Sequence, residues 1–133
     1  MKRILMAGSI IVAVGLIAGA YSWSGRSASA SVLLDGAAFA EKYAATEGAE
    51  LVDVRTPAEY AGGAMPGALL IDYTDPSFES VVATLDTSKP YFIYCRSGNR
   101  SSHAAEIMRA AGIERIYELR GGIASYPHLA AQR

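Results

Sequence analysis

Short apolar runs alternate with amphipathic stretches from Ser31 onward, and the boundaries carry Gly, Pro, Asp or Ser. Apolar runs bounded by turn-forming residues are typical of buried strands, above all when they are β-branched or aromatic. Such runs occur at Leu51–Val54, Ala68–Ile71, Tyr91–Tyr94 and Ile116–Leu119. The third is the clearest, because it is β-branched and aromatic throughout and Pro90 marks its start.

The stretches between these runs have helical spacing, with apolar residues three and four positions apart. Thr56 and Pro57 are typical of a cap and a first helical position, so we expect a short helix over 57–62. Two more helices are predicted over 78–85 and 101–111, the first with Phe78, Val81, Val82 and Leu85 on one face, the second with Ala105, Ile107, Met108 and Ala111 inward and Gly112 as its stop. Alternating strands and helices predict an α/β fold, a parallel sheet of about five strands with helices on both faces.

The first thirty residues follow a different pattern. Lys2 and Arg3 precede an uncharged apolar run, and Ala28 to Ala30 are small. A basic start, an apolar run and small residues at the end are the layout of a secretory signal peptide, so we expect cleavage after Ala30. A second candidate cleavage site follows Ala20, and the apolar run over 4–20 is at the lower limit for a membrane span. A retained membrane tether is therefore the alternative, and either version predicts a periplasmic or otherwise extracytoplasmic domain over 31–133.

Charge and length limit the function of this domain. Without residues 1–30 it has nine basic and thirteen acidic side chains, a net charge of 9 − 13 = −4. An acidic domain of this size is not expected to bind nucleic acid, and about 100 residues form one core. We expect a monomer. The one cysteine, Cys95, excludes an intramolecular disulfide, so an exported free thiol needs another explanation.

Cys95 directly follows the clearest strand, and in parallel α/β sheets ligands bind beyond the carboxyl ends of the strands. The loop Cys95–Arg100 contains Gly98 and Asn99, which tolerate the positive φ angles that curl a backbone. A curled loop and the start of the next helix direct N–H groups at the sulfur, and Arg96 and Arg100 add positive charge. Such surroundings lower a thiol pKa and predict a nucleophilic cysteine. Free cysteines are often buried and inert, which is the simpler alternative.

Three motifs resemble the rhodanese family, and they occur in the family's order along the chain. LVDVRTPAEYAGGAMPGA over 51–68 resembles its opening motif, YFIYCRSGNRS over 91–101 its active-site strand and loop, and YELRGGIASY over 117–126 its closing Gly-Gly motif. The resemblance implies a thiosulfate sulfurtransferase without a cofactor or metal. Cys95 would take the outer sulfur of a small anionic donor as a persulfide and pass it to cyanide or a thiol.

The resemblance also assigns roles within the loop. Ser97, Gly98 and Asn99 would contribute amides that stabilise the persulfide, Arg100 would help to bind the donor, and Arg96 matches a position that is often basic. The six residues from Cys95 to Arg100 match the family loop, whereas related phosphatases use a loop one residue longer. Sulfur transfer is therefore favoured over phosphate or arsenate chemistry, and a non-catalytic binding or redox-sensing module is the alternative.

The remaining candidates have structural interpretations. Asp53 and Arg55 match a pair that in the family supports loops through charge-assisted hydrogen bonds. His103 is expected to face solvent, and His128 has no matching set of metal ligands. The chain departs from the family where Gly63–Ala68 lacks the usual histidine and where Tyr126 replaces a common Trp, changes expected to affect local packing rather than the loop.

Overall fold

The computed structural model describes residues 30–130. Five strands and four α-helices alternate along this part of the chain, and two 3-10 turns end it. The strands are β1 (Val32–Leu34), β2 (Glu50–Asp53), β3 (Leu69–Leu70), β4 (Tyr91–Tyr94) and β5 (Ile116–Leu119). The helices are α1 (Gly36–Ala45), α2 (Pro57–Ala61), α3 (Phe78–Val82) and α4 (Asn99–Ala110), followed by η1 (Ile123–Ser125) and η2 (Pro127–Leu129).

The strands form one parallel sheet in the order β1-β5-β4-β2-β3. Strand β4 therefore lies in the middle, and all four of its residues are buried. A parallel strand in this position has helices on both faces, which explains why its sequence is apolar throughout. The α/β fold with a five-stranded parallel sheet is confirmed.

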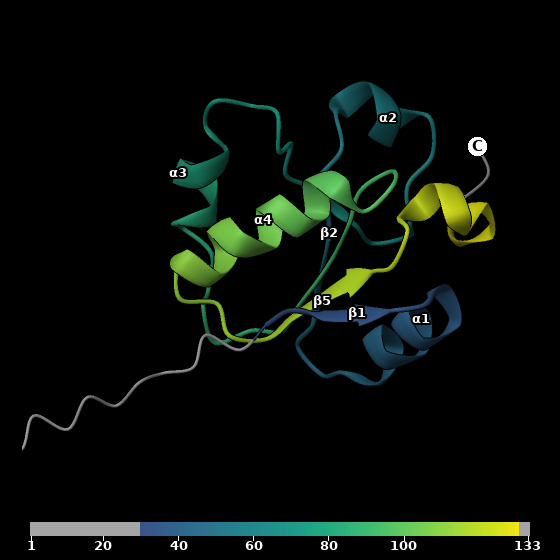
Figure 1. Cartoon of the computed structure of the whole chain (residues 1–133), viewed down its shortest axis with the longest axis horizontal. Coiled ribbons are helices and arrows are strands. Elements are labelled where there is room, and N and C mark those ends of the chain that lie inside the picture. The colour runs from purple at the N-terminus through teal and green to yellow at the C-terminus, as the bar shows by residue number, and fades with distance from the viewer. Residues whose placement is uncertain (1–29, 131–133) are drawn as a thin grey trace, which may run out of the picture.

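Each face of the sheet has its own hydrophobic core. Val52, Ile93 and Met108 belong to the core beneath α3 and α4. Leu51 and Phe92 point the other way, into the core with Phe39 of α1, where the Phe92 ring meets the Phe39 ring edge to face at 5.4 Å. Figure 1 shows α3 and α4 on one side of the sheet and α1 on the other. Successive residues of a strand alternate between these cores, as the strand geometry requires.

All three predicted helices differ in extent from the structure, α2 only by ending at Ala61 instead of Gly62. Helix α4 begins at Asn99 rather than at Ser101, because Gly98 adopts a left-handed conformation as its N-cap. Helix α3 ends at Val82 rather than at Leu85. It buries Phe78 and Val82, whereas Val81, expected on the same face, is 38% exposed. Ala111, which was expected to face inward, is exposed. Ala104, which was not expected to do so, is buried.

Strand β1 and helix α1 were not assigned from the sequence. Val32 and Leu33 of β1 are 45% and 48% exposed, and α1 buries only Gly36 and Phe39. The pattern that marks a buried strand or an amphipathic helix is therefore weak over 32–45.

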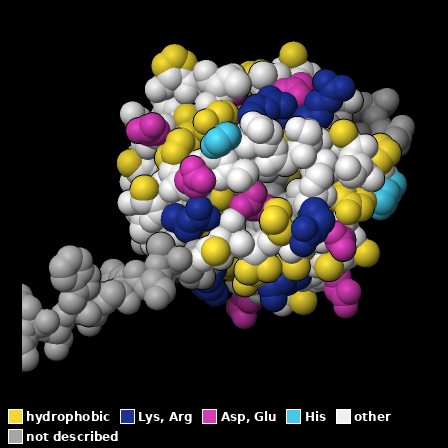
Figure 2. All heavy atoms as spheres, viewed as in Figure 1, with side chains coloured by type: hydrophobic (Ala, Val, Ile, Leu, Met, Phe, Trp, Pro, Cys, Tyr) yellow, Lys and Arg dark blue, Asp and Glu magenta, His cyan; other side chains and the backbone are white. Residues whose placement is uncertain are grey.

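The predicted signal peptide or tether lies almost wholly outside the described residues. Within residues 30–130, no helix is both long and apolar enough to cross a membrane. Figure 2 shows basic and acidic side chains interspersed over the viewed face of the domain. This face therefore presents a mixture of charges rather than a continuous basic patch.

Candidate functional site

The site forms where the chain leaves β4. Cys95 directly follows the strand and is 0% exposed, packed against the core beneath α4. Its carbonyl oxygen accepts a hydrogen bond of 2.9 Å from the Ile123 N–H of η1. The central strand and the turn after β5 together fix the backbone of the cysteine at the carboxyl edge of the sheet, as predicted.

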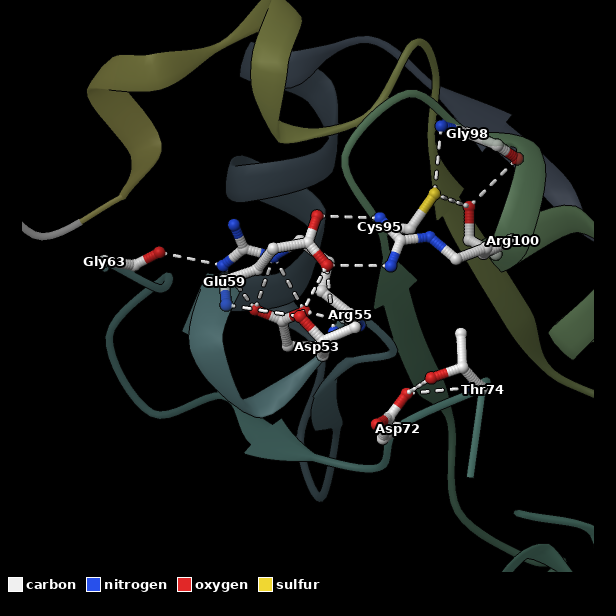
Figure 3. A network of polar contacts seen from close by, with 11 residues as sticks. Asp53, Arg55, Glu59, Gly63, Asp72, Thr74, Cys95, Gly98 and Arg100 are labelled. Carbon is white, nitrogen blue, oxygen red and sulfur yellow. Dashed lines mark hydrogen bonds and ion pairs between the residues drawn. The ribbon is translucent and has the colours of Figure 1, made fainter. Parts of the chain in front are cut away.

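The loop after Cys95 curls around the sulfur (Figure 3). The Gly98 N–H donates to Cys95 Sγ at 3.0 Å, and Ser101 Oγ lies 3.5 Å from the same sulfur. Gly98 has a φ of 97°, which is the left-handed region that glycine favours. Asn99 does not share it: within residues 30–130 every positive φ belongs to a glycine, and Asn99 is the first residue of α4.

The pKa of the Cys95 thiol is lowered, as the sequence predicted. Burial alone would raise it, but the Ser101 side chain and backbone, followed by the Gly98 and Ser97 amides, outweigh burial by hydrogen bonding to the sulfur. Hydrogen bonds of this kind favour the charged form of an acid. The loop therefore stabilises a thiolate.

The loop side chains divide into one that is anchored and three that are exposed. Arg100 makes a two-point ion pair with Glu59 of α2, with Nη1 to Oε2 and Nη2 to Oε1 both at 2.8 Å (Figure 3). The pair lowers the pKa of Glu59 to about 2 and raises that of Arg100. The side chains of Arg96, Ser97 and Asn99 are exposed around the mouth of the loop.

Asp53 and Arg55 form the predicted structural pair. Arg55 Nε donates to both Asp53 carboxylate oxygens at 2.9 and 3.0 Å, and Nη2 reaches Oδ2 at 2.6 Å and the Gly63 carbonyl at 2.8 Å. The guanidinium carbon lies 5.6 Å from the centre of the Tyr94 ring. Tyr94 in turn accepts a hydrogen bond of 3.0 Å at its hydroxyl from the Met65 N–H. The segment that lacks the family histidine is thus tied to the central strand and to Arg55.

The Gly-Gly pair at 121–122 packs against the cysteine loop. A Cβ on Gly122 would lie 2.3 Å from the Arg96 carbonyl oxygen and 2.5 Å from the Ser97 nitrogen. The Ala124 N–H donates to the same Arg96 oxygen at 3.0 Å. Only a residue without a side chain allows this approach, so the closing motif shapes the back of the loop.

Three residues of this site were missed by sequence reasoning. Ser101 is the first residue after the predicted loop, and its position one turn into α4 could have indicated contact with the sulfur. Glu59 follows Thr56 by three residues, a spacing that marks a capping box but not a partner for Arg100. Gly122 belongs to the quoted closing motif, but no sequence feature places it against the loop.

Within residues 30–130, neither histidine makes a hydrogen bond or ion pair with the cysteine loop. His103 is 54% exposed in its side chain, 3.9 Å from Glu106, so the expectation that it faces solvent is confirmed. His128 belongs to η2 and is exposed. Among residues 30–130, no group of three or more His, Cys, Asp or Glu side chains could hold a metal ion.

Comparison with known proteins identifies the family. Residues 37–128 match the family model of the rhodanese-like domain. A "Sulfurtransferase" of Allochromatium vinosum is 36% identical over 93 residues, which cover 70% of this chain and 85% of that protein. The "Thiosulfate sulfurtransferase GlpE" of Pseudomonas entomophila is 33% identical over 90 residues, covering 65% of this chain and 81% of that protein.

Solved structures agree with this match. A rhodanese-like domain protein from Staphylococcus aureus superposes with a TM-score of 0.66 and 24% identity, covering 77% of this chain and 98% of that one. A rhodanese-related protein from Thermoplasma volcanium gives a TM-score of 0.63 and 26% identity, covering 73% and 91%. The fold, the ordered motifs and the matched relatives lead to one conclusion: the chain belongs to the rhodanese-like domain family, a family of the sulfurtransferase type.

Proposed function

We propose that this protein is a sulfurtransferase that moves sulfane sulfur from thiosulfate, or a related small anion, to cyanide or a thiol through a persulfide on Cys95. The observation that supports it best is the hydrogen bond of 3.0 Å from the Gly98 N–H to Sγ, within a loop that lowers the thiol pKa. A populated thiolate is the nucleophile that such a transfer requires.

The proposed reaction has two displacements. In the first, the Cys95 thiolate attacks the outer sulfur of thiosulfate, a new S–S bond forms, and the bond to the SO3 group breaks so that sulfite leaves with the electron pair. In the second, the acceptor attacks the outer sulfur of the persulfide, and Sγ regains the electron pair as a thiolate. With cyanide the product is thiocyanate, and no external oxidant or reductant is consumed.

The loop binds the charge that the reaction creates. In a persulfide anion the negative charge lies on the outer sulfur, one atom beyond Cys95 Sγ. We place this sulfur towards the mouth of the loop, to which Arg96 and Arg100 belong. Backbone N–H groups at the first turn of α4 and in the loop are fixed donors, which stabilise an anion without reorganising. The neutral Cys95 thiol donates to Ser101 Oγ at 3.5 Å, and the Ser101 hydroxyl donates to the Gly98 carbonyl at 3.2 Å. Once the thiol is ionised, the same hydroxyl can turn to donate to the thiolate.

A non-catalytic binding module is the second candidate, and one observation favours it. The same observation counts against a redox sensor, because a sensing thiol must be accessible. Cys95 is 0% exposed, so the loop must open before any donor reaches the sulfur. If the loop stayed closed, the thiol could not attack a sulfur donor. The lowered pKa of Cys95 would then serve no catalytic purpose.

Intact-protein mass spectrometry of the full chain distinguishes the two candidates. Incubation with thiosulfate is expected to add the mass of one sulfur atom, removable by cyanide and absent in Cys95→Ala. No gain with thiosulfate or with an organic persulfide would refute the transferase and favour the module.

We further propose that the chain is exported. The mass of the protein recovered from the extracytoplasmic fraction tests this, because it shows whether and where the first thirty residues are cleaved.

A further inference from the structure

The ion pair between Glu59 and Arg100 connects helix α2 to the cysteine loop. The two residues are 41 positions apart. Each carboxylate oxygen of Glu59 accepts from one terminal nitrogen of Arg100 at 2.8 Å. Their side chains are 27% and 24% exposed, so the pair is only partly shielded from water. Arg100 lies in the first turn of α4, directly after the loop that surrounds Cys95 Sγ.

Glu59 is held in place independently of Arg100. Its Oε2 accepts hydrogen bonds from the Thr56 N–H at 3.0 Å and from Thr56 Oγ1 at 2.9 Å. The Glu59 N–H donates back to Thr56 Oγ1 at 3.3 Å, which completes a capping box at the start of α2. A carboxylate fixed by a helix cap is a rigid anchor, unlike a mobile acidic side chain at the surface.

Arg100 keeps donors for a ligand while it is anchored. A guanidinium has five N–H groups, and the pair with Glu59 uses two of them. The Nε–H makes no hydrogen bond within residues 30–130. In the same range, the one side-chain nitrogen or oxygen that is both buried and unpartnered belongs to Arg109, so Arg100 Nε reaches solvent. The Nε–H is therefore a donor that Glu59 leaves unused, on what we call the open edge of the guanidinium.

Arg100 comes from the first turn of α4, next to the loop that curls around Cys95 Sγ (Figure 3). The hydrogen bond with Glu59 raises the pKa of Arg100, and so does the negative charge of Cys95, which agrees with this placement. Arg96 differs: no hydrogen bond or ion pair of its side chain occurs in the described part of the chain, and it is exposed. The mouth thus has one oriented cation and one unanchored cation.

We propose that Glu59 is a positioning residue, which orients Arg100 so that its open N–H edge directs small anionic reagents to Cys95 Sγ. The identity of the donor as thiosulfate or a similar anion rests on the proposed function, whereas the preference for anions does not. Glu59 would thereby help to determine the class of sulfur donor that the site accepts.

A simpler role for Glu59 predicts the opposite result. If Glu59 only neutralised Arg100, Glu59→Gln would leave one more positive charge at the mouth, and anionic reagents would react faster. If Glu59 positions Arg100, the same change releases the guanidinium and anionic reagents react more slowly. Glutamine has the size of glutamate and its amide oxygen can accept the Thr56 N–H, but its NH2 group cannot accept from Arg100.

The experiment measures alkylation of the full chain by iodoacetate, an anion, and by iodoacetamide, its neutral analogue. Cys95 is the only cysteine, so intact mass reports its modification alone. The ratio of the two second-order rate constants cancels changes in thiol pKa and in loop opening, because both reagents need the same exposed thiolate. We expect Glu59→Gln to lower this ratio about tenfold, the loss of roughly one charge-assisted hydrogen bond.

Two further variants make the result decisive. Glu50→Gln removes a carboxylate that pairs with Lys89 at 2.6 Å, at the opposite edge of the sheet, and should leave the ratio unchanged. Arg100→Lys keeps the charge but cannot form the two-point pair, so the ratio should fall as in Glu59→Gln. An unchanged or higher ratio in Glu59→Gln, or a wild-type ratio in Arg100→Lys, would overturn the proposal.

Turnover separates this inference from the proposed function. With thiosulfate as donor, Glu59→Gln should raise KM for thiosulfate about tenfold. If the wild-type chain takes up no sulfur but the alkylation ratio falls as expected, the proposed function fails and the positioning role stands. If turnover occurs and the ratio does not fall, only the positioning role fails.

Discussion

Gly122 is the position where a single methyl group should disturb the cysteine loop most. A Cβ there would lie 2.3 Å from the Arg96 carbonyl oxygen, 2.4 Å from its carbon and 2.5 Å from the Ser97 nitrogen. Carbon atoms in contact are normally about 3.5–4.0 Å apart. All three neighbours are backbone atoms, so no side chain can rotate away, and the loop or the turn after β5 must move.

The cost of Gly122→Ala has two sources. The backbone has φ 67° and ψ −178°, a conformation essentially restricted to glycine, which costs about 1–3 kcal/mol for another residue. Overpacking adds about 1–3 kcal/mol. The free energy of unfolding should therefore fall by about 2–6 kcal/mol, a large part of the roughly 5–15 kcal/mol typical of a domain.

Gly48→Ala is the matched control. Gly48 has a φ of 70°, yet nothing lies within 4 Å of its ideal Cβ. Its alanine variant should lose only the cost of the left-handed conformation, about 1–2 kcal/mol. Urea unfolding followed by circular dichroism measures both variants, and the difference between them isolates the contact with the loop.

The chemical consequence provides a second assay. Displacing Arg96 and Ser97 lengthens the hydrogen bond from the Gly98 N–H to Sγ, so the pKa of Cys95 should rise in Gly122→Ala and the pH profile of iodoacetamide alkylation should move to higher pH. Gly48→Ala should keep the wild-type profile. Equal stability of the two variants, together with an unshifted profile in Gly122→Ala, would refute the argument that the Gly-Gly turn shapes the loop.

Three further predictions concern the charged and hydrogen-bonding groups. Ser101→Ala removes the side-chain hydrogen bond that helps to lower the Cys95 pKa, so its alkylation profile should move to higher pH, and an unmoved profile would exclude the hydroxyl from this role. Asp53→Asn leaves the Arg55 guanidinium buried without a charged partner and should cost about 3–5 kcal/mol in urea unfolding; a loss below about 1 kcal/mol would contradict the pairing. Glu59 has its pKa lowered from 4.5 to about 2, chiefly by the hydrogen bond from Arg100, so its contribution to stability is complete above pH 4.5 and is lost as the pH falls towards 2. Because the side chain is 27% exposed, this contribution is limited to about 1 kcal/mol. Between pH 4.5 and 2, urea unfolding should therefore show wild type losing about 1 kcal/mol more than Glu59→Gln, and equal losses would contradict the pairing.

The centre of the fold could be predicted because its residues repeat one local pattern. The strands at Tyr91–Tyr94 and Ile116–Leu119 have the predicted bounds, since each is a short apolar run buried by helices. The strand expected at Leu51–Val54 is shifted by one residue, to Glu50–Asp53. At the margin of the sheet, the strand expected at Ala68–Ile71 is shorter, Leu69–Leu70. The three-residue β1 was not predicted, because it is too short and too exposed for a period to be recognised.

The backbone donors of the cysteine loop could also be predicted, because they follow the sulfur directly in the sequence, whereas the contribution of Ser101 was missed. The anchoring of Arg100 could not be predicted, since Glu59 is 41 positions away and both are common surface residues. Contacts over that distance depend on how the strands are ordered in the sheet, and the sequence pattern does not specify that order. The early start of α4 depends on the conformation of Gly98, which the loop closure around Sγ determines.

The position of β4 within the sheet determines how the site behaves when the domain opens in part. β1 pairs with β5 at three positions and β3 pairs with β2 at two, whereas β4 has a neighbour on both sides. We therefore expect edge strands to detach in low-energy openings and amides of the central strand to exchange with solvent only in the most costly ones. The strand that leads into Cys95 should then be among the last to unfold, so the cysteine would keep its backbone support while the periphery of the domain fluctuates.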